Sequence, residues 1–175
     1  MNKKLLALLV IAVLPLMAFD CITSFSDVTV SLNLKPFNAP FPLNSGSNKA
    51  YSGSVTIDPA TLYDQSYTLS GASVYDITVA TKGPDYLGPG AGTVYVNNIP
   101  IFSYNGTWTY YNTPRSLLTD TTLTRNASGV SELINAVTGH RPVVFAVNGT
   151  ITNTPSSSGV DFLIVSAYVQ AYGHK

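Results

Sequence analysis

The chain has 175 residues, of which 45% are hydrophobic and 10% are charged, a composition typical of one ordered domain with a substantial core. Nine Lys and Arg residues balance nine Asp and Glu residues, so the formal net charge is zero. Only Lys3 and Lys4 form a basic pair, so the sequence lacks the positive patch of a nucleic-acid-binding protein, and we do not expect DNA or RNA as partners.

The first twenty residues predict export. Lys3 and Lys4 precede an uninterrupted apolar run at residues 5–19, and Asp20 ends that run, which is the order found in a secretory signal peptide. The run is shorter than the ~20 apolar residues of a membrane-spanning helix. We therefore expect residues 1–20 to be a signal peptide, with a retained anchor as the alternative, and residues 21–175 to form a single exported domain.

The only cysteine, Cys21, follows the apolar run directly. A bacterial lipoprotein carries its diacylglycerol on a cysteine at this position. Phe19 and Asp20, however, occupy positions where a lipobox has small residues. Two outcomes stay open: lipidation of Cys21, which would be the one contact with a membrane, or cleavage near Ala18 that leaves a free thiol. Neither allows a disulfide within the chain, so stability must come from the core.

The exported part begins with the most regular strand pattern of the sequence. Over residues 27–34, four apolar side chains alternate with polar ones, which predicts a strand with one buried face. The apolar row consists of Val28, Val30, Leu32 and Leu34.

Three prolines come next, at positions 36, 40 and 42, and we expect them to interrupt any ladder because proline has no N–H. A second strand is predicted at residues 51–57 and a third within residues 69–81. The glycine-rich residues 83–92 are expected to form a plain loop, since no helical pattern follows them as a phosphate-binding loop would require. The apolar faces of the two strands are predicted to carry Tyr51, Val55 and Ile57, and Tyr75, Ile77 and Val79 respectively.

Asn105-Gly106 predicts a hairpin between residues 99–104 and 107–111, because both residues tolerate the positive φ of a type I′ turn. A two-residue loop would pair Tyr104 with Thr107 and place Trp108 and Tyr110 on the face of Ile101.

Beyond the hairpin, residues 117–124 are expected to form another strand. Ser128 then predicts the N-cap of the one helix, and Gly139 its end. The apolar face of this helix consists of Val130, Leu133, Ile134 and Val137.

The last third of the chain contains two long alternating patterns, starting at Val143 and at Leu163. The polar run at residues 152–159 separates them, so we expect a long hairpin in the centre of a sheet. With eight or nine short strands, one short helix and no strand–helix alternation, the sequence predicts an all-β fold, an antiparallel two-sheet β-sandwich of jelly-roll or immunoglobulin-like type.

Several features together resemble small β-sandwich surface lipoproteins of bacteria: the exported start with Cys21, the Thr- and Ser-rich strands, the segment 129–139, and the stretches RPVVFAVNGTIT and DFLIVSAYVQAY. This resemblance implies a location on the cell surface and no particular activity.

Catalytic residues are sparse. The two histidines, His140 and His174, are expected to be exposed, no G-x-S-x-G motif accompanies them, and Glu132, the sole glutamate, is expected to be solvated on the helix. The aspartates do not have calcium-binding spacing. We therefore expect no enzyme, metal or cofactor, with an Asp-based glycoside hydrolase as the remaining enzymatic alternative.

Two non-enzymatic functions fit the pattern. In the first, the protein is a structural subunit of an extracellular fibre or surface assembly, associating with itself or with other surface proteins. The strand carrying Val28, Val30, Leu32 and Leu34 would then complete the sheet of a neighbour, the alternative being that it pairs within its own domain.

In the second, the protein is a surface lipoprotein that binds carbohydrate or another protein. Tyr104, Trp108, Tyr110 and Tyr111 would form its binding platform, the alternative being that these rings fill the core. Glycosylation, where the host performs it on exported proteins, is predicted at the three sequons of Asn105, Asn126 and Asn148.

Overall fold

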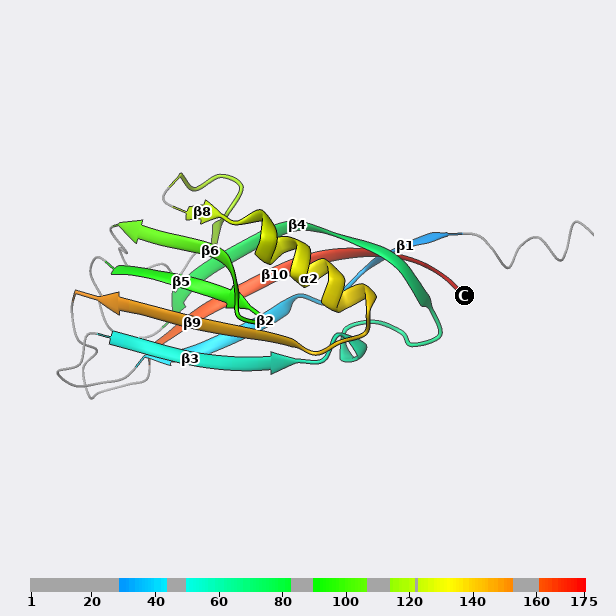
Figure 1. Ribbon diagram of the computed structural model, residues 1–175, viewed down its shortest axis with the longest axis horizontal. Coiled ribbons are helices and arrows are strands. Elements are labelled where there is room, and N and C mark those ends of the chain that lie inside the picture. Colours follow the sequence, from blue (N-terminus) through cyan, green and yellow to red (C-terminus); the bar gives the residue numbers. More distant parts are fainter. Residues whose placement is uncertain (1–28, 44–49, 83–89, 107–113, 122, 153–160) are drawn as a thin grey trace, which may run out of the picture.

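The computed structural model describes residues 29–43, 50–82, 90–106, 114–121, 123–152 and 161–175. These residues form two five-stranded antiparallel sheets and one α-helix, and the predicted all-β sandwich with one short helix is confirmed (Figure 1). None of the described helical segments has the length and apolarity needed to cross a bilayer.

The first sheet, here called the long sheet, is built on two strands of 14 and 15 residues. β10 lies at its centre, with β4 and then β7 on one side, and with β1 and β2 following one another along the other side. The bounds are β1 (Val30–Asn33), β2 (Phe37–Leu43), β4 (Thr68–Lys82), β7 (Arg115–Ser116) and β10 (Asp161–His174).

The second sheet, here called the short sheet, lies over part of the long sheet (Figure 1). Its order in space is β3 (Ala50–Ile57), β9 (Val143–Ile151), β5 (Gly90–Val96), β6 (Ile99–Gly106) and β8 (Leu123–Arg125). The helix α2 (Ala127–Thr138) packs against β4 of the long sheet and against β5, β6 and β9 of the short sheet. A short 3₁₀ turn, η2 (Pro59–Thr61), follows β3.

The core is the layer of apolar side chains between the two sheets and α2. It follows the alternation of the strands: the odd-numbered residues of β2, and those of β10 from Leu163 on, are buried, whereas most of their neighbours reach the outer face. Its largest fully buried side chains are Phe37, Phe41, Phe102, Phe145, Ile77, Ile101, Leu133 and Leu163.

The expectation that the prolines interrupt any ladder is wrong for two of them. Pro40 and Pro42 lie inside β2, which pairs antiparallel with β10. They are tolerated because β2 is an edge strand, where a residue whose nitrogen faces away from the neighbour loses no ladder hydrogen bond. Pro36 lies between β1 and β2, where the edge bends.

The predicted central hairpin of the last third is also wrong. Both long strands exist, but β9 pairs with β3 and β5 in the short sheet, and β10 pairs with β4, β1 and β2 in the long sheet. An alternating pattern shows which face of a strand is buried without specifying its partner, and facing strands of a sandwich have the same pattern as paired ones.

The hairpin turn lies eight residues before the predicted one. Asn97 and Asn98 both have positive φ (49° and 68°), and Val96 pairs with Ile99 across them. Asn105 and Gly106 instead continue β6, where they pair with residues 91 and 90 of β5. Tyr104 pairs with Gly92 of β5 on one side and with Leu123 of β8 on the other, and Thr107, its predicted partner, lies outside the described residues.

Two further expectations need correction because the chain crosses between the sheets. Residues 117–124 do not form one strand: β7 ends at Ser116 in the long sheet, a turn follows, and β8 starts at Leu123 in the short sheet. The glycine-rich loop is shorter than expected, since Gly90 already starts β5.

The helix begins two residues earlier than predicted. Asn126, not Ser128, is the N-cap, because the Asn126 side chain accepts a 2.9 Å hydrogen bond from the Ser128 amide. The predicted end at Gly139 is confirmed. The predicted face is confirmed as well: Val130, Leu133 and Val137 are buried, and Ile134 is half-buried.

Candidate functional site

A two-sheet sandwich exposes the edges of both sheets, and an edge strand is a template for pairing with another chain. The edges differ in how well they are protected. On one flank, the edges are β1 with β2 in the long sheet and β3 in the short sheet. On the other flank, β7 and β8 are the terminal strands.

The edge formed by β2 is protected by its sequence. Because a proline has no N–H to donate, Pro40 and Pro42 remove two of the donors that a new strand would need. Natural sheets use prolines on an edge in this way to prevent unwanted pairing.

The donor-strand candidates lie mostly in β1, and in this structure β1 has a partner in its own chain. It pairs antiparallel with the end of β10, from Val30 opposite Gly173 to Asn33 opposite Gln170. Val30 and Leu32 are half-buried and Leu34 is buried, so the predicted inward face is confirmed for these three residues. Val28 and Cys21 lie outside the described residues.

The sequence of β3 itself lacks the proline and charge that usually protect an edge strand. Its sequence, AYSGSVTI, has eight residues without proline or charge, and among the described strands only β9 pairs with it. The exposed side chains are small, being Ala50, Ser52, Ser54 and Thr56. Over residues 51–57, no described strand pairs with β3 on the side away from β9, and this length is typical of a full strand.

The inward face of β3 holds the strand firmly in its own sheet. Tyr51 is buried, and burial raises the pKa of its phenol above the usual range, so the ring stays neutral. A Cβ added at Gly53 would lie 3.2 Å from Cδ1 of Phe41, which shows how closely β3 packs on β2. The edge is therefore anchored to the core through its inward face.

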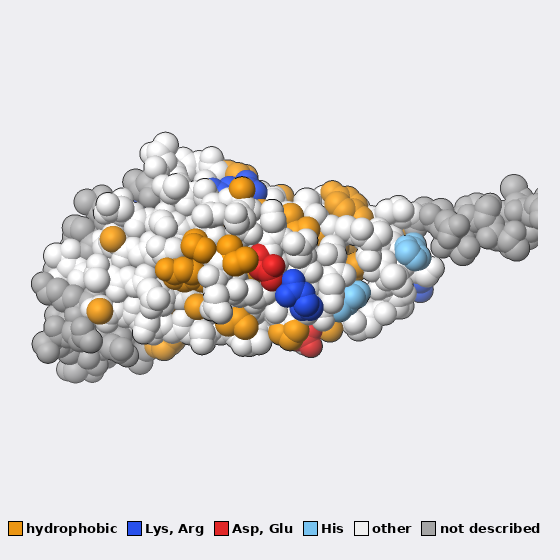
Figure 2. Space-filling view, in the orientation of Figure 1, with side chains coloured by type: hydrophobic (Ala, Val, Ile, Leu, Met, Phe, Trp, Pro, Cys, Tyr) orange, Lys and Arg blue, Asp and Glu red, His pale blue; other side chains and the backbone are white. Residues whose placement is uncertain are grey.

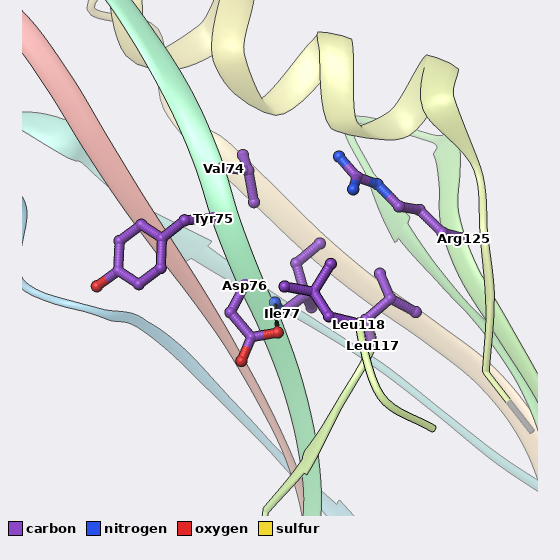
Figure 3. A pocket seen from close by; sticks show the side chains of 7 residues that line it. All are labelled: Val74, Tyr75, Asp76, Ile77, Leu117, Leu118 and Arg125. Atoms are coloured by element: carbon purple, nitrogen blue, oxygen red, sulfur yellow. Dashed lines mark hydrogen bonds between the residues drawn. The ribbon is translucent and has the colours of Figure 1, made fainter. Parts of the chain in front are cut away.

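The opposite flank carries a shallow pocket between β4 and the chain that leads into α2 (Figure 3). Its empty space, about 170 Å³ with its open mouth included, is below the ~300–1,000 Å³ of typical small-molecule sites. Arg125 and Val74 point toward one another, whereas Tyr75 and Asp76 point away from the helix (Figure 3). The pocket is lined by Val74, Tyr75, Asp76, Ile77, Leu117, Leu118 and Arg125.

The one acidic residue that lines this pocket, Asp76, stabilises the fold through hydrogen bonds. Asp76 accepts hydrogen bonds from the Ile77 amide (2.8 Å) and from the Ser116 hydroxyl (2.7 Å), which joins β4 to β7. Other described aspartates act in the same way: Asp58 caps η2 through the Ala60 amide, and Asp64 binds the Ser66 amide. The hydrogen bonds from Ser66 lower the pKa of Asp64.

The predicted aromatic platform is not supported where the structure describes it. Tyr104 is only 3% exposed and belongs to the core, which agrees with the alternative prediction that these aromatic rings fill the core. Trp108, Tyr110 and Tyr111 lie outside the described residues. Of the sequons, Asn105 and Asn148 are exposed on strands, and Asn126 is exposed while its side chain caps α2.

Glu132, which was predicted to be solvated, instead interacts with two neighbouring side chains. Glu132 accepts a hydrogen bond from Asn97 Nδ2 (2.8 Å) and pairs with Arg141 (3.0 Å). Asn97 also accepts a hydrogen bond from the Val144 amide, so this turn residue connects β5, β9 and α2. Sequence reasoning missed Asn97, although two adjacent asparagines between two apolar strands are a turn signal.

The histidines do not form a catalytic group with the described residues around them. His140 is exposed, and its Nδ1 shares a 2.7 Å hydrogen bond with the Tyr63 hydroxyl. His174, the last residue of β10, is half-buried, so the expectation that it is exposed is wrong. Within the described parts of the chain, no three His, Cys, Asp or Glu side chains gather into a group that could hold a metal.

Acid is expected to weaken the junction around Glu132. The hydrogen bond from Asn97, together with the Arg141 guanidinium, lowers the pKa of Glu132. The stabilisation is therefore complete above the ordinary glutamate pKa of ~4.3 and is lost as the pH falls through the lower value of the folded state. Urea unfolding of Glu132→Gln should show a smaller loss of unfolding free energy between about pH 5 and about pH 3 than the natural protein. Identical pH profiles would show that the pair contributes nothing.

Comparison of the chain with protein-family models, with curated proteins and with solved structures finds no match. The functional argument therefore depends on the edges and surfaces described above.

Proposed function

We propose that this protein is an exported structural subunit that assembles with copies of itself at the cell surface by β-strand pairing, and that β3 is the strand that pairs. The observation that carries the proposal is the contrast on one flank of the molecule. β2 has two prolines on its edge, whereas β3, beside it, has eight residues without proline or charge.

The charge distribution supports association. Residues 21–175 hold seven Lys and Arg residues and eight Asp and Glu residues, so the exported part has a formal net charge of only −1 and little electrostatic repulsion to keep monomers apart. Figure 2 shows a surface over α2 and the short sheet in which charged side chains are few and uncharged atoms dominate. Contact between copies through this face would bury few charges.

Two geometries of assembly follow from the edges. Two β3 strands pairing antiparallel would join two short sheets into one across a two-fold axis, and the product is a closed dimer. Pairing of β3 with a different edge would be heterologous and would give an open filament.

Replacing Ser54 with lysine is expected to prevent assembly without unfolding the subunit. Ser54 is exposed at the middle of β3, and antiparallel self-pairing would bring two lysines together. Sedimentation velocity over a concentration series should show association of the natural protein and a monomer for Ser54→Lys, and electron microscopy would distinguish dimers from filaments.

The matched control is Ser131→Lys, the same substitution on the exposed face of α2, which should leave association unchanged. A natural protein that stays monomeric throughout the series, or a Ser54→Lys variant that associates as strongly as the natural protein, would refute the proposal.

A further inference from the structure

A cluster of tyrosines lies on the outer face of the long sheet, away from β3. The ring centroids of Tyr75 and Tyr168 are 5.9 Å apart, with an angle of 44° between the planes. Tyr172 is four residues farther along β10 on the same face, at about 13 Å for a rise of about 3.3 Å per residue. Tyr75 and Tyr172 are 51% and 37% exposed, which is unusual among the large side chains of this fold.

A β-bulge creates this cluster. Tyr168 pairs with Asp76 and Val169 pairs with Val74, so Tyr75 is an extra residue in β4. Without the bulge, Tyr75 would share the buried face of Ile77, as the alternation of the sequence predicts. With it, Val74 packs on the core while Tyr75 turns outward beside Tyr168. Bulges are frequent beside functional sites because they redirect one side chain in this way.

The space between the two aromatic positions is polar and neutral. The Tyr172 hydroxyl donates to Gln170 Oε1 at 3.3 Å and lies 3.4 Å from the Ser73 hydroxyl. In the neighbouring edge strand, Asn33 pairs with Gln170 and is exposed. The face thus offers amide and hydroxyl groups between rings, and these groups can both donate and accept hydrogen bonds.

Charge complementarity indicates the class of ligand. The nearest acid in the strand, Asp76, is engaged with the Ile77 amide and the Ser116 hydroxyl, and the residues between Tyr168 and Tyr172 on β10 carry no charge. Both donors are uncharged and bond the same oxygen, Oδ1, so the Asp76 carboxylate keeps its negative charge and would repel an anionic ligand. A sugar ring, in contrast, has C–H groups on its face, which stack on aromatic rings, and hydroxyls at its rim, which match amides and hydroxyls.

From this arrangement we propose that the Tyr75–Tyr168–Tyr172 face binds a neutral oligosaccharide in extended form, with one sugar over the Tyr75–Tyr168 pair and another at Tyr172. The site is independent of the proposed assembly, because β3 belongs to the other sheet. An occupied face would attach the protein to a glycan surface while its edges remain available.

The test is calorimetric titration of the purified protein with cellohexaose and with maltohexaose, followed by NMR to map the residues affected. At least one neutral hexasaccharide should bind, and an acidic control, hexagalacturonate, should not. Tyr75→Ala and Tyr172→Ala should each weaken binding about tenfold, the loss expected for one stacked ring.

Tyr95→Ala is the matched control, because Tyr95 is a half-buried tyrosine between buried Val94 and Val96 in the short sheet; it should leave binding unchanged. Failure of both neutral sugars to bind, or an equal loss in Tyr95→Ala, would overturn the proposal. Tyrosine variants that change sedimentation instead of sugar binding would show that the face is an interface between copies. Ser54→Lys should still bind the sugar, which separates this test from that of assembly.

Discussion

Phe145→Ala is expected to lower the free energy of unfolding by about 4 kcal/mol, the largest effect of any single change considered for this protein. Phe145 of β9 is fully buried and faces Phe37 of β2, which is also fully buried. The two ring centroids are 6.3 Å apart, and the pair connects the two sheets. Truncation would leave a cavity in the middle of the sandwich that the surrounding strands cannot close.

Urea unfolding of Phe145→Ala measures this loss, with Phe162→Ala as the control. Phe162→Ala removes the same phenyl ring, but from a half-buried position on the outer face of β10. We expect it to lower the free energy of unfolding by about 1 kcal/mol. Equal losses at the two positions would mean that the Phe37–Phe145 contact does not hold the sheets together.

Gly129→Ala is expected to destabilise the protein by about 3 kcal/mol, although alanine is favoured over glycine in a helix by about 1 kcal/mol. Gly129 lies in the first turn of α2, directly against β6. A Cβ at this position would overlap the carbonyl oxygen of Pro100 and lie 2.5 Å from Cα of Ile101. The obstacle is backbone, which cannot move aside as a flexible side chain could.

Urea unfolding also shows whether Gly129→Ala destabilises or stabilises the protein. Ser131→Ala, on the exposed face of α2, should be neutral or slightly stabilising because helix propensity alone acts there. If Gly129→Ala were stabilising too, the close approach of α2 to β6 would not exist in solution. A destabilised Gly129→Ala beside an unchanged Ser131→Ala would confirm that packing, and not propensity, requires glycine at this position.

Sequence patterns could not predict the exposed edge of β3 or the exposed tyrosines of the long sheet, for two different reasons. The pattern of β3 identified its buried residues, but whether a strand is terminal depends on which other strands lie beside it. Tyr75 was placed on the wrong face because a single extra residue reverses the alternation, and no local feature of the sequence marks that residue.

What the sequence by itself determined is the set of local properties: the all-β class, the strands β1, β3, β9 and β10 with their buried faces, and the apolar face of α2. These follow from side-chain periodicity, which is a property of each segment alone. Only the tertiary structure decided that β9 and β10 lie in different sheets, that the proline-rich β2 is a strand, and that the turn is at Asn97 and Asn98. Pairing and register arise from contacts between distant segments, and many partners satisfy the same alternating pattern.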